Sequence, residues 1–262
     1  MQERIAGISY SAIIEGVAEM TAPTASEGFA HVPAVSREAQ SPSSETMLLA
    51  QELTHRFNND LAAMGGYIAL TATRSSDIEV KTVLSRLLRR IEDIALLQRA
   101  LQAPTTDRAI DAGEYLRGLC RCISRAKLQH RNIRLILRAA SLTLKETETW
   151  RMGMIVSELI NNAARHAFAD RGGTIRVELR SRGHSIECSI ADNGCGLVSV
   201  NVGGGMKIVR SLAAFLDGAV EYQQGESGTV AVLSFPGTQR ELQSAGRRME
   251  AATMNHQPNE RN

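Results

Sequence analysis

Apolar side chains recur at helical spacing through residues 46–102, on both sides of the polar segment TRSSD at 73–77. The first stretch steps by three or four residues, at Leu53, Phe57, Leu61, Met64 and Ile68. The second follows a heptad, with Gln98 as its one polar member, at Leu84, Leu87, Ile91, Ile94 and Leu101. This pattern predicts a hairpin of two long helices.

A single hairpin of this kind leaves much of both apolar stripes exposed to water. Two hairpins that pair as a four-helix bundle bury those stripes against each other. We therefore expect residues 46–102 to form the interface of a homodimer.

Helical and strand periods alternate through residues 103–237. Helical spacing covers three segments, 112–129, 147–168 and 205–218. Strand patterns, several of them with a clear period of two, cover 132–139, 142–145, 173–181, 185–192, 219–224 and 229–235. This alternation predicts an α/β sandwich, a sheet covered on one face by helices.

The two ends of the chain differ from these regions in composition. Residues 21–46 are rich in Ser, Thr, Ala and Pro without a period, which is typical of a linker, and a short amphipathic helix is expected near 8–20. The expected organisation is an N-terminal extension and linker over 1–45, a hairpin domain over 46–102, a sandwich domain over 103–237 and a flexible tail over 238–262.

Composition and charge exclude several classes of function. Lys and Arg number 30 against 28 Asp and Glu, a net charge of +2, so we expect no nucleic-acid partner. No apolar run approaches the roughly 18 residues of a membrane span, and the start MQERIAGISY lacks the shape of a signal peptide. The four cysteines include one Cys-x-Cys pair but no complete zinc spacing. Free thiols in a cytoplasmic protein are favoured over a metal site.

The first candidate for chemistry is His55, in the segment QELTHRFNNDL of the first predicted helix. It lies off the apolar seam, so its ring should be at least partly exposed. Glu52 and Asn59 share its helix face and can orient the imidazole or accept a proton. A neutral imidazole is a competent nucleophile or phosphoryl acceptor near neutral pH. The alternative is an ordinary surface histidine in a polar stretch.

The second candidate is the segment SELINNAARHAF at the end of a long predicted helix. Glu158, Asn162 and Arg165 share one helix face, with Asn161 and His166 beside it. An amide oxygen can coordinate Mg²⁺, which bridges phosphate oxygens, and an arginine can neutralise phosphate charge. The alternative is a solvated polar face.

Three glycine-containing segments follow. In ADNGCGL, Asp192 leaves a strand, and a buried carboxylate there could accept a hydrogen bond from an adenine amino group; the alternative is a simple turn. GGGMKIV opens a helix, where phosphate can approach backbone N–H groups; the alternative is a linker. In GESGTVAVLSF, Gly228 and Thr229 begin the last strand.

The order of these five segments resembles that of the sensor histidine kinases, over residues 46–237. The segments ELTHRFNND and NNAARHAF, the latter followed by GGTIRVEL, are similar to the subgroup whose histidine box reads His-Arg-x-x-Asn. The resemblance implies an α+β chain. A helical-hairpin dimerisation and phosphoacceptor domain precedes an ATP-binding sandwich of the type shared with gyrase, the Hsp90 chaperone and MutL. This sandwich is not a Walker-type fold, and the sequence accordingly contains no Walker loop G-x-x-x-x-G-K-[ST].

The resemblance also implies roles for single residues. His55 matches the phosphorylated histidine, Asn162 the Mg²⁺ ligand, and Glu158 the acidic residue that orients the metal's water or assists proton removal. Asp192 matches the adenine-binding aspartate. The remaining matches are the turn beneath the base at Gly194 and Gly196, the glycines flanking the triphosphate at Gly203 and Gly205, the hydroxyl near the adenine at Thr229, and the position of the family's lysine at Arg165. His166 lies beside this phosphate cluster in the sequence, so a binding role suits it better than acceptor chemistry.

Two departures from the family pattern affect the expected chemistry. The larger branch of the family has an acidic residue directly after the histidine, but this position is Arg56. Either Glu52 or Asp60 then serves as the base, or no residue does. Between Gly196 and Gly203 only the six residues LVSVNV remain, which implies a very short ATP lid.

The resemblance implies an ATP- and Mg²⁺-dependent protein histidine kinase. It would autophosphorylate His55 and pass the phosphoryl group to an aspartate in the receiver domain of a response regulator. Two alternatives stay open. One is a non-catalytic histidine phosphotransfer protein with a degenerate ATP-binding domain, and the other is a serine kinase of the anti-sigma type.

Overall fold

The structure, a computed structural model, describes residues 44–168, 171–195, 204–225 and 228–237. The expected helix near 8–20, the linker, the segment LVSVNV and the C-terminal tail lie outside the described residues. The chain divides into two compact units, Met1–Ala62 and Ala63–Asn262, with the boundary inside the first described helix. None of the described helices is long and apolar enough to cross a membrane.

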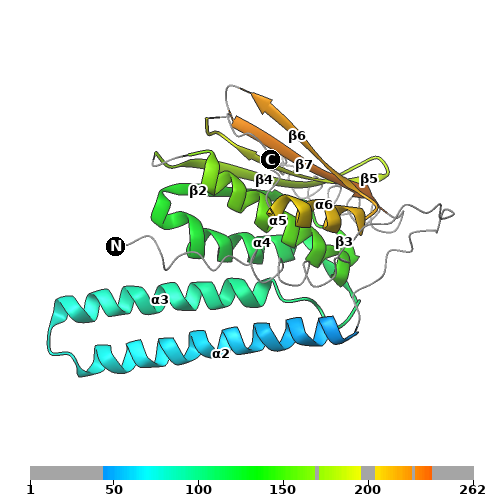
Figure 1. Cartoon of the computed structure of the whole chain (residues 1–262). Coiled ribbons are helices and arrows are strands. Elements are labelled where there is room, and N and C mark those ends of the chain that lie inside the picture. Colours follow the sequence, from blue (N-terminus) through cyan, green and yellow to red (C-terminus); the bar gives the residue numbers. More distant parts are fainter. Residues whose placement is uncertain (1–43, 169–170, 196–203, 226–227, 238–262) are drawn as a thin grey trace, which may run out of the picture. The chain divides into compact units, whose positions relative to one another are not determined.

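The predicted helical hairpin is confirmed. It consists of α2 (Ser44–Arg74) and α3 (Ile78–Ala100), which are joined by three residues (Figure 1). Asp77 begins α3 as its N-cap, because its Oδ1 accepts a hydrogen bond from the N–H of Glu79 at 2.7 Å. The break that the sequence places at 73–77 therefore contains the residue that starts the second helix.

The predicted α/β sandwich is also confirmed. Its five-stranded sheet has the order β2-β4-β5-β7-β6, and only the β2–β4 pair is parallel. Three helices cover one face of this sheet (Figure 1). The strands are β2 (Ile133–Ala139), β4 (Gly173–Arg182), β5 (Ser185–Asp192), β6 (Ala219–Gly225) and β7 (Gly228–Pro236), and the helices are α4 (Ala112–Ile123), α5 (Glu146–His166) and α6 (Gly204–Ala214).

The core lies between the sheet and these helices, where the sequence periods place it. In β5, every second side chain is buried, at Ile186, Cys188 and Ile190. The apolar face of α5 is buried too, including Met152 and Ile155. Burial of these faces is the main source of stability for such a layer pair.

Two local features differ from the prediction. The helix expected over 112–129 ends at Ile123 and continues as a π-helix, η1 (Ser124–Leu128), and a 3-10 turn, η2 (Gln129–Arg131). A short strand that the sequence did not indicate, β1 (Ala109–Asp111), pairs antiparallel with β3 (Thr143–Lys145) in a separate two-stranded sheet. Its partner β3 falls within the strand expected over 142–145.

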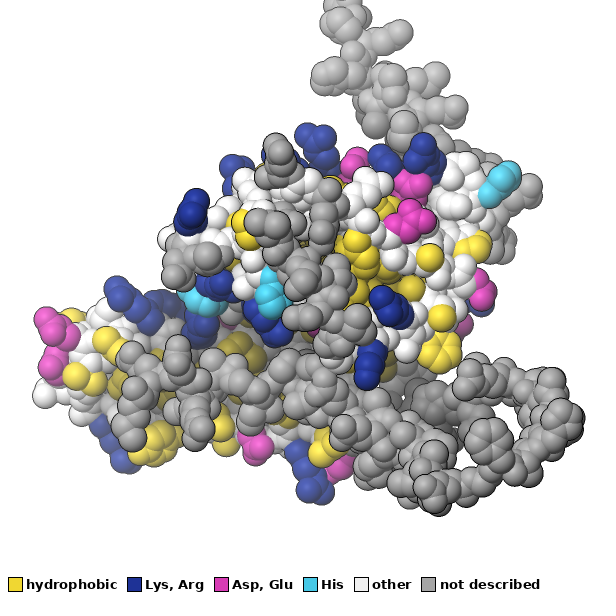
Figure 2. Space-filling view, turned by 45° about the horizontal axis from the view of Figure 1, so that its top comes forward, with side chains coloured by type: hydrophobic (Ala, Val, Ile, Leu, Met, Phe, Trp, Pro, Cys, Tyr) yellow, Lys and Arg dark blue, Asp and Glu magenta, His cyan; other side chains and the backbone are white. Residues whose placement is uncertain are grey.

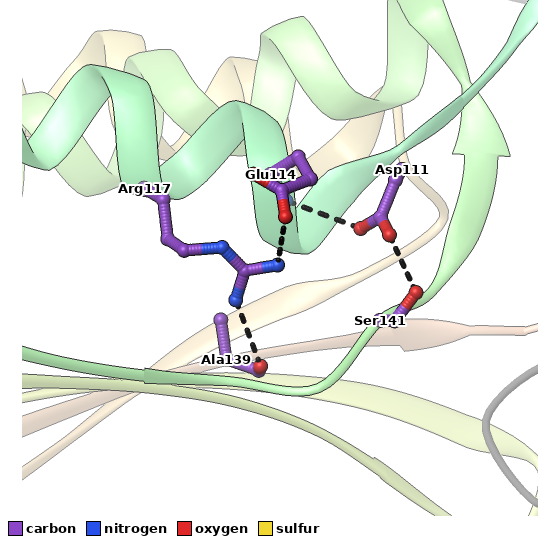
Figure 3. A network of polar contacts seen from close by, with 5 residues as sticks. All are labelled: Asp111, Glu114, Arg117, Ala139 and Ser141. Atoms are coloured by element: carbon purple, nitrogen blue, oxygen red, sulfur yellow. Dashed lines mark hydrogen bonds and ion pairs between the residues drawn. The ribbon is translucent and has the colours of Figure 1, made fainter. Parts of the chain in front are cut away.

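A polar network ties the start of α4 to the end of β2 (Figure 3). The Oδ1 of Asp111 accepts a hydrogen bond from the N–H of Glu114 at 3.1 Å, and its Oδ2 accepts one from the hydroxyl of Ser141. Arg117 donates to the carbonyl of Ala139 at 3.3 Å and pairs with Glu114 at 2.9 Å. These contacts fix the position of α4 over the sheet.

The end of α3 packs on the sandwich. Leu97 and Leu101 are 2% and 5% exposed, and the indole N–H of Trp150 donates to the carbonyl of Leu101 at 2.9 Å. The hydroxyl of Tyr115 donates to the carbonyl of Ala100 at 3.0 Å. The heptad seam predicted as a dimer surface therefore does not extend to Leu101, whereas Leu87 within it is 46% exposed.

Candidate functional site

His55 is exposed on α2, as its position off the apolar seam predicts. Its Nδ1 lies 3.2 Å from the side-chain nitrogen of Asn59, one helical turn later. Glu52 is engaged elsewhere, because its Oε1 accepts a hydrogen bond from Nε of Arg56 at 2.8 Å. That hydrogen bond and the charge of Arg56 hold the pKa of Glu52 below its ordinary value. The structure thus brings Asn59 to the ring, and Glu52 pairs with Arg56.

The second part of the candidate site centres on Asp192, the last residue of β5. Its Oδ1 accepts hydrogen bonds from the N–H of Gly194 at 2.9 Å and from the N–H of Thr229 at 3.3 Å. Gly228 has a φ of 121°, and a Cβ there would overlap the carbonyl oxygen of Asp192. A carboxylate held by two backbone donors has a fixed direction, and no hydrogen bond from the described residues is seen at its Oδ2, which suits this atom to accept from a ligand. The role predicted for Thr229 lay in its hydroxyl; the structure gives its backbone N–H the contact with Asp192.

Asn162 lies on α5 against the first turn of α6. Its amide nitrogen is 3.7 Å from the sulfur of Met206, which is buried and also 3.5 Å from the hydroxyl of Tyr222. Because the nitrogen takes this contact, the amide oxygen is the atom left for a cation. The sequence analysis gave no role to Met206 or Tyr222, and no signal in the sequence links them to Asn162.

Glu158 lies one turn earlier on α5 and meets the same end of α6. A Cβ at Gly205 would overlap the carboxylate of Glu158, so this position needs a glycine for the two helices to approach. Arg165 and His166 are exposed at the end of α5. Two of the glycines assigned to the site, Gly196 and Gly203, lie outside the described residues.

A lysine that the sequence analysis did not single out completes this group. Nζ of Lys127, on η1, donates a hydrogen bond to Oδ1 of Asn161 on α5 at 3.0 Å. Burial lowers the pKa of Lys127 and so does the charge of Arg165, whereas the charge of Glu158 raises it. Thirty-four residues separate Lys127 from Asn161, so no helical spacing could have indicated the contact.

These residues fit a nucleotide. At one end of the group, the free oxygen of Asp192 suits an amino group on a flat base. At the other, α5 carries an amide oxygen, a carboxylate and a cation of the kinds that suit a metal-bound polyphosphate, at Asn162, Glu158 and Arg165. The start of α6, where Gly205 lies against the Glu158 carboxylate, has backbone N–H groups that are unpaired within the helix.

The four cysteines are free thiols. Cys120 and Cys188 are buried, and burial raises the pKa of Cys120 to about 12. Within the described ranges, no three His, Cys, Asp or Glu side chains come together in a way that could hold a metal ion. The thiols of the two buried cysteines are therefore protonated at neutral pH. Among the described residues, the Cys-x-Cys segment is not part of a cluster that could hold a metal ion.

Comparison with known protein families gives two adjoining matches. Residues 52–127 match a model described as histidine kinase, and residues 123–235 match one described as histidine kinase-like ATPase domain. The second match covers β2 to β7 with α5 and α6 and implies ATP binding. Together the two matches include both parts of the candidate site.

Named relatives agree with these matches. Blue-light-activated histidine kinase 2 of Erythrobacter litoralis is 28% identical over 80% of this chain and 64% of its own length. Sensor histidine kinase PdtaS of Mycobacterium tuberculosis is 30% identical over 71% of this chain and 39% of its own length. The chain thus spans less than two thirds of either relative.

A solved structure also aligns with this chain. The histidine kinase domain of a blue-light-activated histidine kinase from Erythrobacter litoralis is 20% identical, with a TM-score of 0.48, over 70% of this chain and 99% of that domain. The two family matches and the named relatives carry the assignment: this chain belongs to the histidine kinases and is homologous to sensor histidine kinases.

Proposed function

We propose that this protein is an ATP-dependent histidine kinase that phosphorylates its own His55 and passes the phosphoryl group to an aspartate of a response-regulator receiver domain. The observation that carries this proposal is the carboxylate of Asp192, fixed by the N–H groups of Gly194 and Thr229 at the end of β5. A carboxylate fixed in this way suits adenine recognition, and the exposed imidazole of His55 supplies a phosphoryl acceptor in the same chain.

On the acceptor side, Asn59 sets which ring nitrogen of His55 reacts. In the structure the amide nitrogen of Asn59 faces Nδ1. Turning this amide by half a turn would let its oxygen accept from Nδ1–H and would leave Nε2 with a free lone pair in solvent. Nε2 then attacks the γ-phosphorus as the bond to the departing ADP oxygen breaks. The developing charge on the ring is stabilised by the amide oxygen, a role for which Glu52 is less suited while it pairs with Arg56.

On the nucleotide side, the oxygen of Asn162 would hold Mg²⁺, which supplies neutralisation of phosphate charge when it is bound. Glu158, one turn earlier, would orient a water of that ion. Asp192 would accept a hydrogen bond from the adenine amino group. Positioning and charge neutralisation are the main sources of catalysis in phosphoryl transfer, so these residues would supply most of the rate.

Replacing Asp192 by Asn should weaken Mg-ATP binding by about 1–3 kcal/mol, because the fixed acceptor becomes an amide that can present its N–H₂ to the adenine amino group. Isothermal titration calorimetry measures this change. Asp217→Asn, at an exposed position after α6, is the matched control and should bind as the wild type does. Equal affinities in the wild type and Asp192→Asn would remove Asp192 from the base-binding site.

We propose that the hairpin forms a homodimer. Large apolar side chains are exposed on α3 at helical spacing, with Val80 42%, Val83 61% and Leu87 46% exposed. On the end of α2, Met64 and Tyr67 are 56% and 74% exposed. Apolar side chains, yellow in Figure 2, reach the surface among charged ones. Two such stripes on one hairpin are typical of a surface that a second copy covers.

Leu87→Asp should therefore convert the dimer to monomers, because it places a charge in the packed interface. Light scattering at micromolar concentration measures the mass. The control is Phe215→Asp, which makes the same change at an exposed apolar position outside the hairpin and should leave a dimer. A wild type that is monomeric under these conditions would contradict the homodimer.

The free thiols fit a reducing compartment, so we propose that the protein acts in the cytoplasm.

The proposed function is tested by titrating the full chain with Mg-ATP and then incubating it with γ-labelled ATP and a receiver domain. We expect binding, label on His55, and transfer of that label to the receiver. A chain that does not bind ATP but takes label from a phosphorylated receiver would be a phosphotransfer protein. Acid-stable label on a hydroxyl would identify a serine kinase.

A further inference from the structure

Lys127 has an unusual position for a lysine. Its side chain is half-buried between η1 and α5, and its ammonium donates to the neutral oxygen of Asn161. Of the charges around it, Glu158 favours the ammonium form and Arg165 opposes it. A half-buried cation with a neutral hydrogen-bond partner and a second cation near it stabilises a fold poorly.

The backbone that carries Lys127 is firmly held. Its neighbours Ala126 and Leu128 are buried, at 4% and 0% exposure. Arg125, on the same π-helical turn, forms an ion pair with Asp93 of α3 at 2.7 Å. Short π-helical segments of this kind occur frequently at functional sites. The turn therefore presents the ammonium of Lys127 to α5 from a fixed position.

The face of α5 that Lys127 meets is the face proposed to hold the metal-bound polyphosphate. Asn161 precedes the proposed ligand Asn162, and Glu158 lies one turn before it. A polyphosphate brings several negative charges to this face, and a nearby ammonium is a common phosphate-binding group. The charge of Lys127, which the fold alone does not require, then has an anionic partner.

We propose that Lys127 is a further residue of the nucleotide site. Its ammonium binds the polyphosphate of Mg-ATP, and it donates to Asn161 when no nucleotide is bound. This inference rests on the proposed function. It adds a residue from η1, outside the motifs at α5, α6 and the end of β5, to the phosphate part of the site.

The test compares Mg-ATP with adenosine, which lacks phosphate, in the full chain by competition against a fluorescent ATP analogue. Lys127→Gln removes the charge but keeps an N–H donor for Asn161. We expect Lys127→Gln to raise the Kd of Mg-ATP by about ten- to a hundredfold, the effect of losing one hydrogen bond to a charged group. The Kd of adenosine should stay within about twofold of the wild-type value, since base binding by Asp192 is unaffected.

Lys145→Gln, which removes an exposed lysine at the opposite end of α5, is the matched control and should bind both ligands as the wild type does. Lys127→Met serves as the second variant if Lys127→Gln does not fold. Mg-ATP binding within twofold of the wild type would overturn the inference, as would equal weakening of Mg-ATP and adenosine, which would identify a structural role. If the wild type itself binds no ATP, the proposed function fails as well.

Discussion

The chain carrying His55→Ala should take no label from γ-labelled ATP, whereas the wild-type chain should carry label that is lost in acid and stable in base. The reason is that the imidazole is the proposed acceptor, and a phosphorus–nitrogen bond hydrolyses in acid. His55 is exposed and has Asn59 at 3.2 Å to orient its ring. The measurement is autoradiography after acid and base treatment of the denatured protein.

Two other histidines in the described part of the chain have different settings. His130 contacts Arg90 at 3.2 Å, and burial together with the charges of Arg90 and Arg131 lowers its pKa. His184 is exposed in the turn between β4 and β5, so His184→Ala is the matched control and should label as the wild type does. Undiminished label in His55→Ala would show that the acceptor lies elsewhere in the chain.

Asn162→Ala should abolish Mg²⁺-dependent phosphorylation while the protein stays folded. Its amide oxygen is the proposed cation ligand, and losing a bound metal removes several kcal/mol of charge stabilisation, roughly a hundredfold or more in rate. The side chain also contacts the sulfur of Met206, so only a weak packing contact is lost from the fold. The measurement is the rate of label incorporation at several Mg²⁺ concentrations, with thermal unfolding to check stability.

Asn162→Asp is the comparison for this change, because it keeps an oxygen ligand at the same position. We expect it to retain a Mg²⁺-dependent rate where Asn162→Ala has none. If Asn162→Ala incorporated label at the wild-type rate with the same Mg²⁺ dependence, another residue would be the ligand of the cation. The proposal that Glu158 orients a water of a cation held by Asn162 would then be wrong.

The positions of most elements followed from the sequence because their periods are local. The prediction for α5 was 147–168, and the helix spans Glu146–His166. The prediction for β5 was 185–192, and the strand has those bounds. Repeats of 3.6 and of two residues reflect one buried face of one element, which neighbouring residues alone specify.

The spacing of Glu52 and Arg56 in the sequence also indicates an ion pair. Arg56 follows Glu52 by four residues, the spacing of an ion pair along a helix, and the structure forms that pair at 2.8 Å. Arg56 therefore competes with His55 for the carboxylate of Glu52. Asn59 follows His55 by four residues, and its side chain contacts the His55 ring.

Local sequence patterns were enough to predict the helical hairpin, the helices and strands of the sandwich, the exposed His55 and the polar face of α5, since each pattern depends on residues close together in the chain. Tertiary packing set which distant groups meet. It joined Lys127 to Asn161, Asn162 to Met206 and Asp192 to the N–H of Thr229. It also buried Leu101 against the sandwich, although its heptad position predicted a place in the dimer seam. Such contacts depend on how whole elements pack, and a periodic pattern specifies which face of an element is buried but not which partner covers it.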